Sequence, residues 1–451
     1  MKKITFLIAA VSVLILDGCS IFGKYTNETT VPDNIYGTQD VVSKAAQDSS
    51  IGLISWREYF ADPKLQTLID SALIRNVDMN AAQLGIRQAE ALMKVAKLAY
   101  LPSISITPSI NIRPDNGYIA PVSGGWNIGG IGTITNRKRE AMAITLQTTD
   151  QADYVRSTIV ATIAKSYNEL QLLDRQLEIV TQTEKIWGEV LETQIALMEN
   201  GRAYSTSVNQ MKASLLGVTL QKMDLQNAIN DLESAICVLI KESPQHIDRS
   251  GWGSYRLPLK IGTGIPASML ENRADVRMAG HNLEAAFYVT KAARAAMLPG
   301  LSLTGLVGWG NQGKPISSPT EFISNAVASL TMPIFAQGSI RANIKVSKMQ
   351  QQIAADQYVQ AIVNAGNEVN QALRDCQLAK QKEDIYQEQV ATLRDAYSAT
   401  QELMKNGKAS YIEVLTAQET LLSAQLNEST NIFNGESALI DLYLALGGGA
   451  K

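Results

Sequence analysis

The 451-residue sequence predicts a mainly α-helical fold built as two tandem copies of one unit, each a pair of β-strands followed by a long helical hairpin. Three observations lead to this prediction: a stretch of strict polar–apolar alternation, an internal repeat, and two long segments without proline. The net charge of −3 and the lack of a Lys/Arg block argue against nucleic acid as a partner. Two histidines and three cysteines offer little for metal or redox chemistry.

The alternation lies in "SISITPSINIR", residues 103–113. Isoleucine or proline stands at every even position and a polar residue at every odd one. Because side chains alternate between the two faces of a strand, one face is expected to be apolar and the other polar. Such a strand fits either a soluble sheet or a membrane strand with lipid on one side and water on the other.

The internal repeat consists of two matches in the same order. "DMNAAQLGIRQAEALMKVAKLAYLPSISIT" (78–107) aligns without a gap with "DVRMAGHNLEAAFYVTKAARAAMLPGLSLT" (275–304), and "LMENGRA" (197–203) aligns with "LMKNGKA" (403–409). In each copy a helix is stopped by proline, and a strand, a Gly/Pro-rich loop and a second strand follow. We expect strands at about 102–113 and 126–135, and again at about 300–310 and 322–335.

Two segments, 140–200 and 339–406, contain no proline. As continuous helices they would extend about 90 Å and about 100 Å at the rise of an α-helix. Their apolar residues recur every three or four positions in a narrow stripe, which is typical of coiled-coil packing. An Asn-Gly pair ends each segment and a helical pattern returns after it, so we predict helical hairpins at about 136–242 and 338–446.

The four predicted strands have the length of membrane-spanning strands. Four strands cannot close a barrel, and their open edges would leave backbone groups unsatisfied in lipid. A β-barrel shared by more than two chains solves both problems. The polar face of residues 103–113 would then line a water-filled lumen.

The N-terminus reads as a bacterial secretory signal. Lys2 and Lys3 precede an apolar run too short to span a bilayer, and Gly18-Cys19 follows. This end resembles a lipobox, in which Cys19 would be lipidated and become the mature N-terminus, and Ser20 suggests sorting to the outer membrane. The alternative is an ordinary signal peptide with an unmodified cysteine. Cys237 and Cys376 lie in helical patterns and are expected to be packing residues.

Five segments together resemble the outer membrane factor family, the TolC/OprM-like channels of tripartite efflux pumps. They are "WREYFADPKLQTLIDSALIRNVDMNAAQLGIRQAEA", "ENRADVRMAGHNLEAA", "AAMLPGLSLTGLVG", "MPIFAQG" and "NGKASYIEVLTAQETLLSAQ". The resemblance covers nearly the whole mature chain. It implies a homotrimer with a twelve-stranded membrane β-barrel and a twelve-helix periplasmic α-barrel, which works with a periplasmic adaptor (membrane fusion protein) and an inner-membrane pump of the RND type.

Under this interpretation the chain divides into six parts. They are a lipoprotein signal peptide (1–18), an N-terminal tail with an equatorial segment (19–61), the first repeat (62–242), an equatorial linker (243–265), the second repeat (266–446) and a C-terminal tail (447–451).

The resemblance also assigns roles to the hairpin tips, which dock onto the adaptor in such channels. The matching residues here are Gly201, Ala203, Val208, Gly407, Ala409 and Val414. Small residues would let a partner helix approach closely. The alternative is that the glycines only make the turn.

Beyond the second tip, TolC-like channels carry acidic residues that narrow the periplasmic mouth. The matching positions hold Glu413 and Thr416, so one of the two carboxylates is absent. Three copies of Glu413 around an axis would form a cation-focusing ring. Glu413 could equally be a solvated helix residue.

No catalytic motif stands out, so we expect neither an enzyme nor a bound cofactor. "GWGNQG" (308–313) fits the pattern of a phosphate-binding loop, but prolines rather than a helix follow it. His246 and His281 lack metal-ligand spacing. We predict an outer-membrane exit duct that passively exports small molecules from the periplasm or the pump. The alternatives are a lipid-anchored periplasmic adaptor or scaffold, or the exit duct of a type I protein secretion system.

Overall fold

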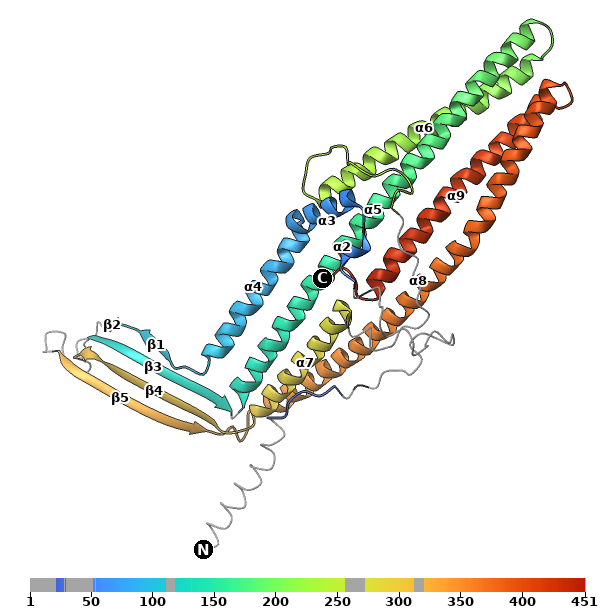
Figure 1. Cartoon of the computed structure of the whole chain (residues 1–451). Coiled ribbons are helices and arrows are strands. Elements are labelled where there is room, and N and C mark those ends of the chain that lie inside the picture. The colour runs from blue at the N-terminus through green and yellow to red at the C-terminus, as the bar shows by residue number, and fades with distance from the viewer. Residues whose placement is uncertain are drawn as a thin grey trace. The chain divides into compact units, whose positions relative to one another are not determined.

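The computed structural model describes residues 22–27, 29, 52, 54–110, 118–130, 132–255, 272–311 and 320–450 (Figure 1). The chain forms two compact units. We name Met1–Pro32, Gln83–Gln151 and Asp275–Ile362 the sheet unit, and Asp33–Ala82, Ala152–Ala274 and Val363–Lys451 the tip unit. The predicted signal peptide and Cys19 lie outside the described residues.

The helices confirm that the chain is a duplication. Their bounds are α2 Trp56–Tyr59, α3 Pro63–Arg75, α4 Val77–Leu98, α5 Thr133–Glu199, α6 Ser205–Leu239, α7 Ala274–Ala295, α8 Ser339–Lys405 and α9 Tyr411–Ala445. α4 and α7 have 22 residues each, α5 and α8 have 67 each, and α6 and α9 have 35 each. Equal lengths in the same order are expected when one unit is copied and both copies keep their packing. Among the described residues, none of these helices is both long enough and apolar enough to cross a bilayer.

The strands form one antiparallel sheet. They are β1 Ser103–Ile106, β2 Ser109–Ile110, β3 Tyr118–Gly130, β4 Gly300–Gly310 and β5 Glu321–Thr331, in the order β1-β3-β4-β5, with β2 also paired to β3. The β3–β4 pair joins the two repeats. β1 and β5 are the edges of this sheet.

The sheet has one apolar and one polar face, as the alternation predicted. The register places Ile104 opposite Gly124, Val122 opposite Val307, and Trp309 opposite Phe322, and directly paired residues share a face. The apolar face carries Ile104, Ile106, Val122, Trp126, Leu301, Leu303, Val307, Trp309, Phe322 and Leu330. The other face carries Ser103, Ser105, Ser123, Asn127, Ser302, Thr304, Asn325 and Ser329, with Ile119, Pro121, Leu306, Ile323 and Val327 as apolar members. Ile104 and Ile106 are 75% and 70% exposed, so the part of the chain that the structure describes leaves this region of the apolar face open.

Three strand predictions were wrong in their bounds. The strand expected at 126–135 is β3, which ends at Gly130, and residues 133–135 belong to α5. Gly132, at φ 90°, makes the turn between them. The strand expected at 102–113 is split into β1 and β2 around Pro108, which has no N–H for the ladder. The strand expected at 322–335 ends at Thr331, since Pro333 follows.

Four helical segments of the sheet unit lie in the same order as the strands. Thr145 of α5 contacts Ala89 of α4, with Oγ1 3.5 Å from the carbonyl oxygen. Asp150 of α5 accepts hydrogen bonds from α7, and Thr290 of α7 donates one to the Ser347 carbonyl of α8 at 3.1 Å. The helix order is therefore α4-α5-α7-α8. Each helix follows or precedes the strand in the matching place, β1, β3, β4 or β5.

The tip unit has an apolar core and polar anchors. Its core cluster consists of Ile179, Val180, Trp187, Met211, Val218 and Leu422. Arg249 binds Asp174 through both Nε and Nη2, and Glu233 through Nη1. Tyr167 donates a hydrogen bond to Asp62 at 2.7 Å and accepts one from the Ser250 N–H at 2.8 Å. These bonds fix the segment around Ser250, part of the predicted linker at 243–265, to the long helix α5.

Candidate functional site at the hairpin tips

Both hairpin tips have the same turn geometry. Gly201 and Gly407 have φ of 68° and 69°, a left-handed conformation that glycine adopts without steric cost. The Arg202 N–H bonds to the Leu197 carbonyl at 2.8 Å, and the Lys408 N–H bonds to the Leu403 carbonyl at 2.8 Å. Such bonds from the second residue beyond the helix end are typical of the Schellman motif. The predicted turns at Asn-Gly are confirmed.

The second tip has a stronger helix start than the first. Ser410 and Glu413 form a capping box at the start of α9: the Ser410 N–H donates to the Glu413 carboxylate at 2.6 Å, and the Glu413 N–H donates to Ser410 Oγ at 3.4 Å. The first tip has Tyr204 at the equivalent position, with no side-chain cap. Glu413 therefore stabilises the tip as well as carrying a charge.

The predicted docking residues divide into two groups. Gly201 and Gly407 are exposed, and Ala203 and Ala409 are partly exposed, so these four lie on the surface of the tips. Val208 and Val414 are only 8% and 2% exposed. They lie in the first turns of α6 and α9, and their burial shows that they stabilise the hairpins from within. Their side chains are covered in the single chain, and their part in adaptor docking stays a prediction.

The two predicted mouth residues are both on the surface. Glu413 and Thr416 are exposed on the first two turns of α9. The Glu413 carboxylate remains available to solvent while it accepts the hydrogen bond from Ser410. The surface position is compatible with a role in a ring around an axis.

Polar contacts join α6 to α9 near the tips. The Tyr411 hydroxyl donates to Gln210 Oε1, and the Ser214 hydroxyl donates to Glu419 Oε1 at 3.2 Å. All four residues are exposed or partly exposed. Sequence reasoning missed these pairs, because the partners are about 200 residues apart and share no motif.

The structure also shows the surroundings of the cysteines, the histidines and the "GWGNQG" segment, for which the sequence predicted no functional site. Cys237 and Cys376 are both buried free thiols. His246 contacts Glu233 at 2.8 Å, and His281 contacts Asp150 at 2.6 Å. Gly308 and Gly310 of "GWGNQG" lie in β4, while residues 312 and 313 are outside the described part. Over the described ranges, no group of three or more His, Cys, Asp or Glu residues is arranged to hold a metal ion.

The family of outer membrane efflux proteins matches residues 68–239 and 265–448. The chain belongs to this family. The match covers both repeats and confirms the predicted fold class and resemblance. It also confirms the predicted role and place, an outer-membrane export channel that extends into the periplasm. Members of the family are channels, so the family decides between the duct and the scaffold in favour of the duct.

Individual relatives and solved structures are similar to this protein over nearly the whole chain. The cation efflux system protein CusC of Escherichia coli is 27% identical over 451 residues, 97% of each chain. The solvent efflux pump outer membrane protein SrpC of Pseudomonas putida is 26% identical over 474 residues, again 97% of each. The solved structure of the outer-membrane channel OprN has a TM-score of 0.83 at 19% identity, covering 95% of this chain and 98% of that one. The open state of the Neisseria gonorrhoeae MtrE outer membrane channel has a TM-score of 0.78 at 25% identity, covering 94% and 99%.

Membership of this family explains why the sheet has one apolar and one polar face. An eleven-residue strand such as β5 is about 36 Å long, and at the tilt usual in outer-membrane proteins it rises about 27 Å, enough to cross the apolar layer. The exposed apolar face then contacts lipid and the polar face lines the channel. Trp309 and Phe322, with ring centroids 5.5 Å apart, lie at one end of the strands, and Trp126 pairs with Leu303, closer to the middle of the sheet. The aromatic pair matches the girdle expected at one membrane interface.

Proposed function

We propose that this channel receives its cargo at the hairpin tips from a periplasmic adaptor and an inner-membrane pump of the RND type. The observation that carries the proposal is the pair of matched tips, each with an exposed glycine turn and a small residue behind it. Helices can approach such a surface closely. The work of export comes from the pump, and the duct itself needs no cofactor.

We also propose that Cys19 carries the N-terminal lipid and holds the trimer in the outer membrane. The lipobox-like sequence supports this. Metabolic labelling with a palmitate analogue is expected to mark the wild-type chain and not Cys19→Ala. Equal labelling of both would overturn it.

The third part of the proposal is that Glu413 sets the ion preference at the periplasmic mouth of the channel. Three copies of the exposed Glu413 carboxylate would form a ring that favours cations. Because Glu413 also closes the capping box, Glu413→Ala would change the charge and the helix start together. Glu413→Gln separates them, since glutamine can make the same capping bond.

The test is the single-channel conductance of the purified protein in planar bilayers under a salt gradient. We expect Glu413→Gln to lower the cation preference and leave the protein as heat-stable as wild type. Thr416→Glu, which adds a second carboxylate, should raise the preference. Glu402→Gln is the matched control, because Glu402 is an exposed carboxylate near the same tip that pairs with Lys405. If Glu413→Gln keeps the wild-type cation preference, Glu413 acts only as a helix cap and forms no cation-selective ring.

A further inference from the structure

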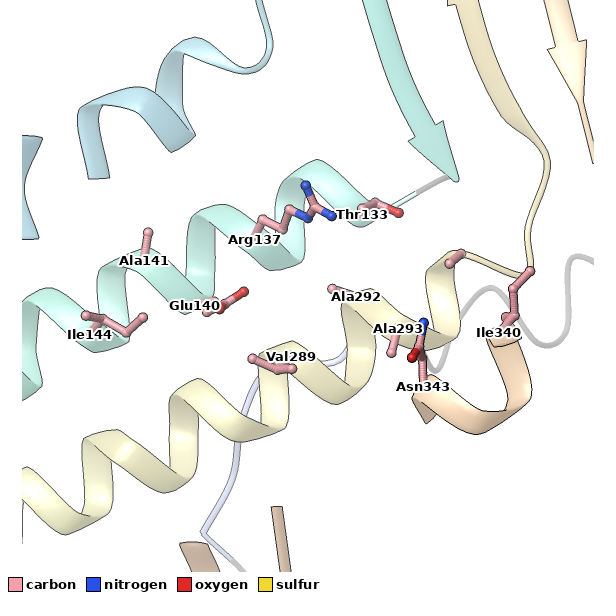
Figure 2. Close-up of a pocket in the computed structure, with 11 residues that line it drawn as sticks. Thr133, Arg137, Glu140, Ala141, Ile144, Val289, Ala292, Ala293, Ile340 and Asn343 are labelled. Carbon is pink, nitrogen blue, oxygen red and sulfur yellow. The ribbon is translucent and has the colours of Figure 1, made fainter. Parts of the chain in front are cut away.

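A cavity of about 560 Å³ lies in the sheet unit between α5, α7 and the start of α8 (Figure 2). Its walls are mostly small or apolar: Ala141, Ile144, Val289, Ala292, Ala293, Ala296 and Ile340. Its polar members are Thr133, Arg137, Glu140 and Asn343. The cavity therefore combines an apolar surface with one positive and one negative side chain.

The cavity is close to the membrane part of the chain. Thr133 is the first residue of α5, directly after the turn that follows β3, and Ala296 lies just before β4 begins at Gly300. Cargo moving outward would pass this level before it reaches the strands.

Helix geometry shows which side of the helix layer the cavity faces. On α7, Arg277 and His281 mark the side toward α5, because both bind Asp150, and Thr290 marks the side toward α8. At 100° per residue, Val289, Ala292, Ala293 and Ala296 fall on one face between these two sides. Phe287 falls on the opposite face, and Tyr288 lies on the side toward α5, where Arg139 of α5 stands over its ring.

The opposite face is covered by the N-terminal segment, residues 22–27. Tyr25 makes an edge contact with the Phe287 ring at 5.5 Å, and its N–H bonds to the Tyr288 hydroxyl at 3.4 Å. Arg139 of α5 donates to the Phe22 carbonyl at 3.1 Å. Phe22 is three residues from Cys19, about 10 Å of extended chain. A lipid on Cys19 must reach the membrane outside the channel, so this face is the outer one and the cavity faces the lumen. This step rests on the lipidation proposed above.

The two charged residues of the cavity are one helical turn apart on α5. Glu140 points into the space between α5 and α7 (Figure 2). Burial raises the pKa of Glu140, and the nearby Arg137 charge opposes the rise. A cation bound beside Glu140 would stabilise its carboxylate, and an anion beside Arg137 would do the same for the guanidinium.

We propose that this cavity is a cargo-binding site for amphiphiles with an adjacent ammonium and anionic group, such as α-amino acids with long apolar side chains. The ammonium would bind Glu140, the anionic group would bind Arg137, and the apolar part would lie along the alanine-rich face of α7. A ligand with only one charge satisfies only one of the two residues. The cavity thus favours zwitterions over fatty acids and alkylamines of equal length.

The test measures binding by calorimetry to the purified full-length trimer in lipid nanodiscs, with empty nanodiscs subtracted. The probes are 2-aminodecanoate, decanoate and decylamine. We expect 2-aminodecanoate to bind about 10-fold more tightly than either of the others. Glu140→Gln should remove this advantage over decanoate, and Arg137→Gln should remove it over decylamine. Glu284→Gln, on the outer face of α7, is the control and should change nothing. Equal affinities for the three probes in wild type would overturn the proposal.

Two further measurements fix the location and the source of the ligand. Ala293→Cys, treated with a cationic methanethiosulfonate reagent, should lose single-channel conductance and be protected by 2-aminodecanoate, whereas wild type, with buried Cys237 and Cys376, should not respond. Modification confirmed by mass without a change in current would place the cavity outside the lumen and overturn the assignment. Tighter binding of dihexanoylphosphatidylethanolamine than of 2-aminodecanoate would give the site to a membrane lipid instead. Both of the results that count against the assignment leave the channel conducting, so they are distinct from a failure of the mouth or tip proposals.

Discussion

Replacing Leu92 by Asp should dissociate the trimer, because α4 and α8 lie at the two ends of the helix layer and each leaves an apolar stripe uncovered. On α4 the exposed stripe is Leu84, Leu92, Val95 and Leu98, and on α8 it is Val346, Met349 and Ile353. Gaps of three, four and eight residues keep these side chains on one face of each helix, as in a coiled-coil seam. The sheet edges β1 and β5 lie at the same two ends. We therefore expect α8 and β5 of one copy to pack against α4 and β1 of the next.

The size of the effect follows from exposure. Leu92 is 66% exposed in a single chain. Full burial of a leucine contributes about 1.5–3 kcal/mol, so covering the exposed part of Leu92 contributes about 1–2 kcal/mol at each interface. Asp at this position loses that contribution and leaves an unpaired carboxylate in the seam, which raises the cost to about 3–5 kcal/mol per interface. The cost occurs at all three interfaces of the trimer.

The assay is light scattering after size-exclusion chromatography, over a range of protein concentrations in detergent. Leu92→Asp should be monomeric where wild type is a trimer, and Leu92→Ala should be intermediate. Lys94→Asp is the control, since it places the same carboxylate on the same helix away from the stripe. If the Leu92→Asp trimer dissociates at the same protein concentration as the wild-type trimer, this account of the seam is refuted.

Three smaller predictions concern single sites. Burial raises the pKa of Asp150, but hydrogen bonds from His281 and Arg277 outweigh it and the pKa lies below its usual range. The stabilisation that Asp150 provides is therefore complete above about pH 4 and is lost as the pH falls below that. Asp150→Asn should be about 1–3 kcal/mol less stable at pH 7. Its free energy of unfolding in urea should also fall less steeply with decreasing pH on the acid limb than that of wild type. Gly407→Ala should destabilise the second tip by about 1 kcal/mol, seen as faster hydrogen exchange there, because φ is 69°. Tyr411→Phe removes the hydroxyl bonded to Gln210 and should raise the open probability of single channels up to about 10-fold.

Each of these has a result that would contradict it. An acid limb of Asp150→Asn parallel to wild type would mean that Asp150 does not couple protonation to folding. Unchanged exchange at the second tip in Gly407→Ala would mean that the turn relaxes to another conformation. Equal open probabilities for Tyr411→Phe and wild type would show that this contact does not hold the mouth.

The duplicated architecture and the sheet faces could be predicted from sequence because both depend on short periods. The alternation at 103–113 has the period of a strand, and the Asn-Gly pairs mark helix ends through backbone conformation alone. The bounds of β3 could not be read, because Pro121 and several glycines interrupt its pattern and a bulge follows Asn127.

The features of the site that the sequence could not reveal depend on long-range packing. The burial of Val208 and Val414 depends on the partner helices of each hairpin, which the tip motifs do not contain. Arg249 binds Asp174, 75 positions away in the chain, so no local sequence pattern predicts this ion pair. The cavity beside Glu140 is formed by three helices from both repeats and is visible only once they are assembled.

The tip unit joins the two hairpins in two ways, through a shared apolar cluster and through hydrogen bonds nearer the tips. Trp187 of α5 and Met211 of α6 lie in the buried core cluster, which Leu422 of α9 also joins. Nearer the tips, α6 and α9 meet through side-chain hydrogen bonds such as that from Tyr411 to Gln210. Such a bond contributes about 0.5–1.5 kcal/mol, whereas truncating a buried tryptophan costs about 3–5 kcal/mol. Parting the tips therefore breaks these hydrogen bonds and the apolar contacts of Leu422, and a partner shifts the mouth toward its open state when it binds the parted tips more tightly by at least that amount.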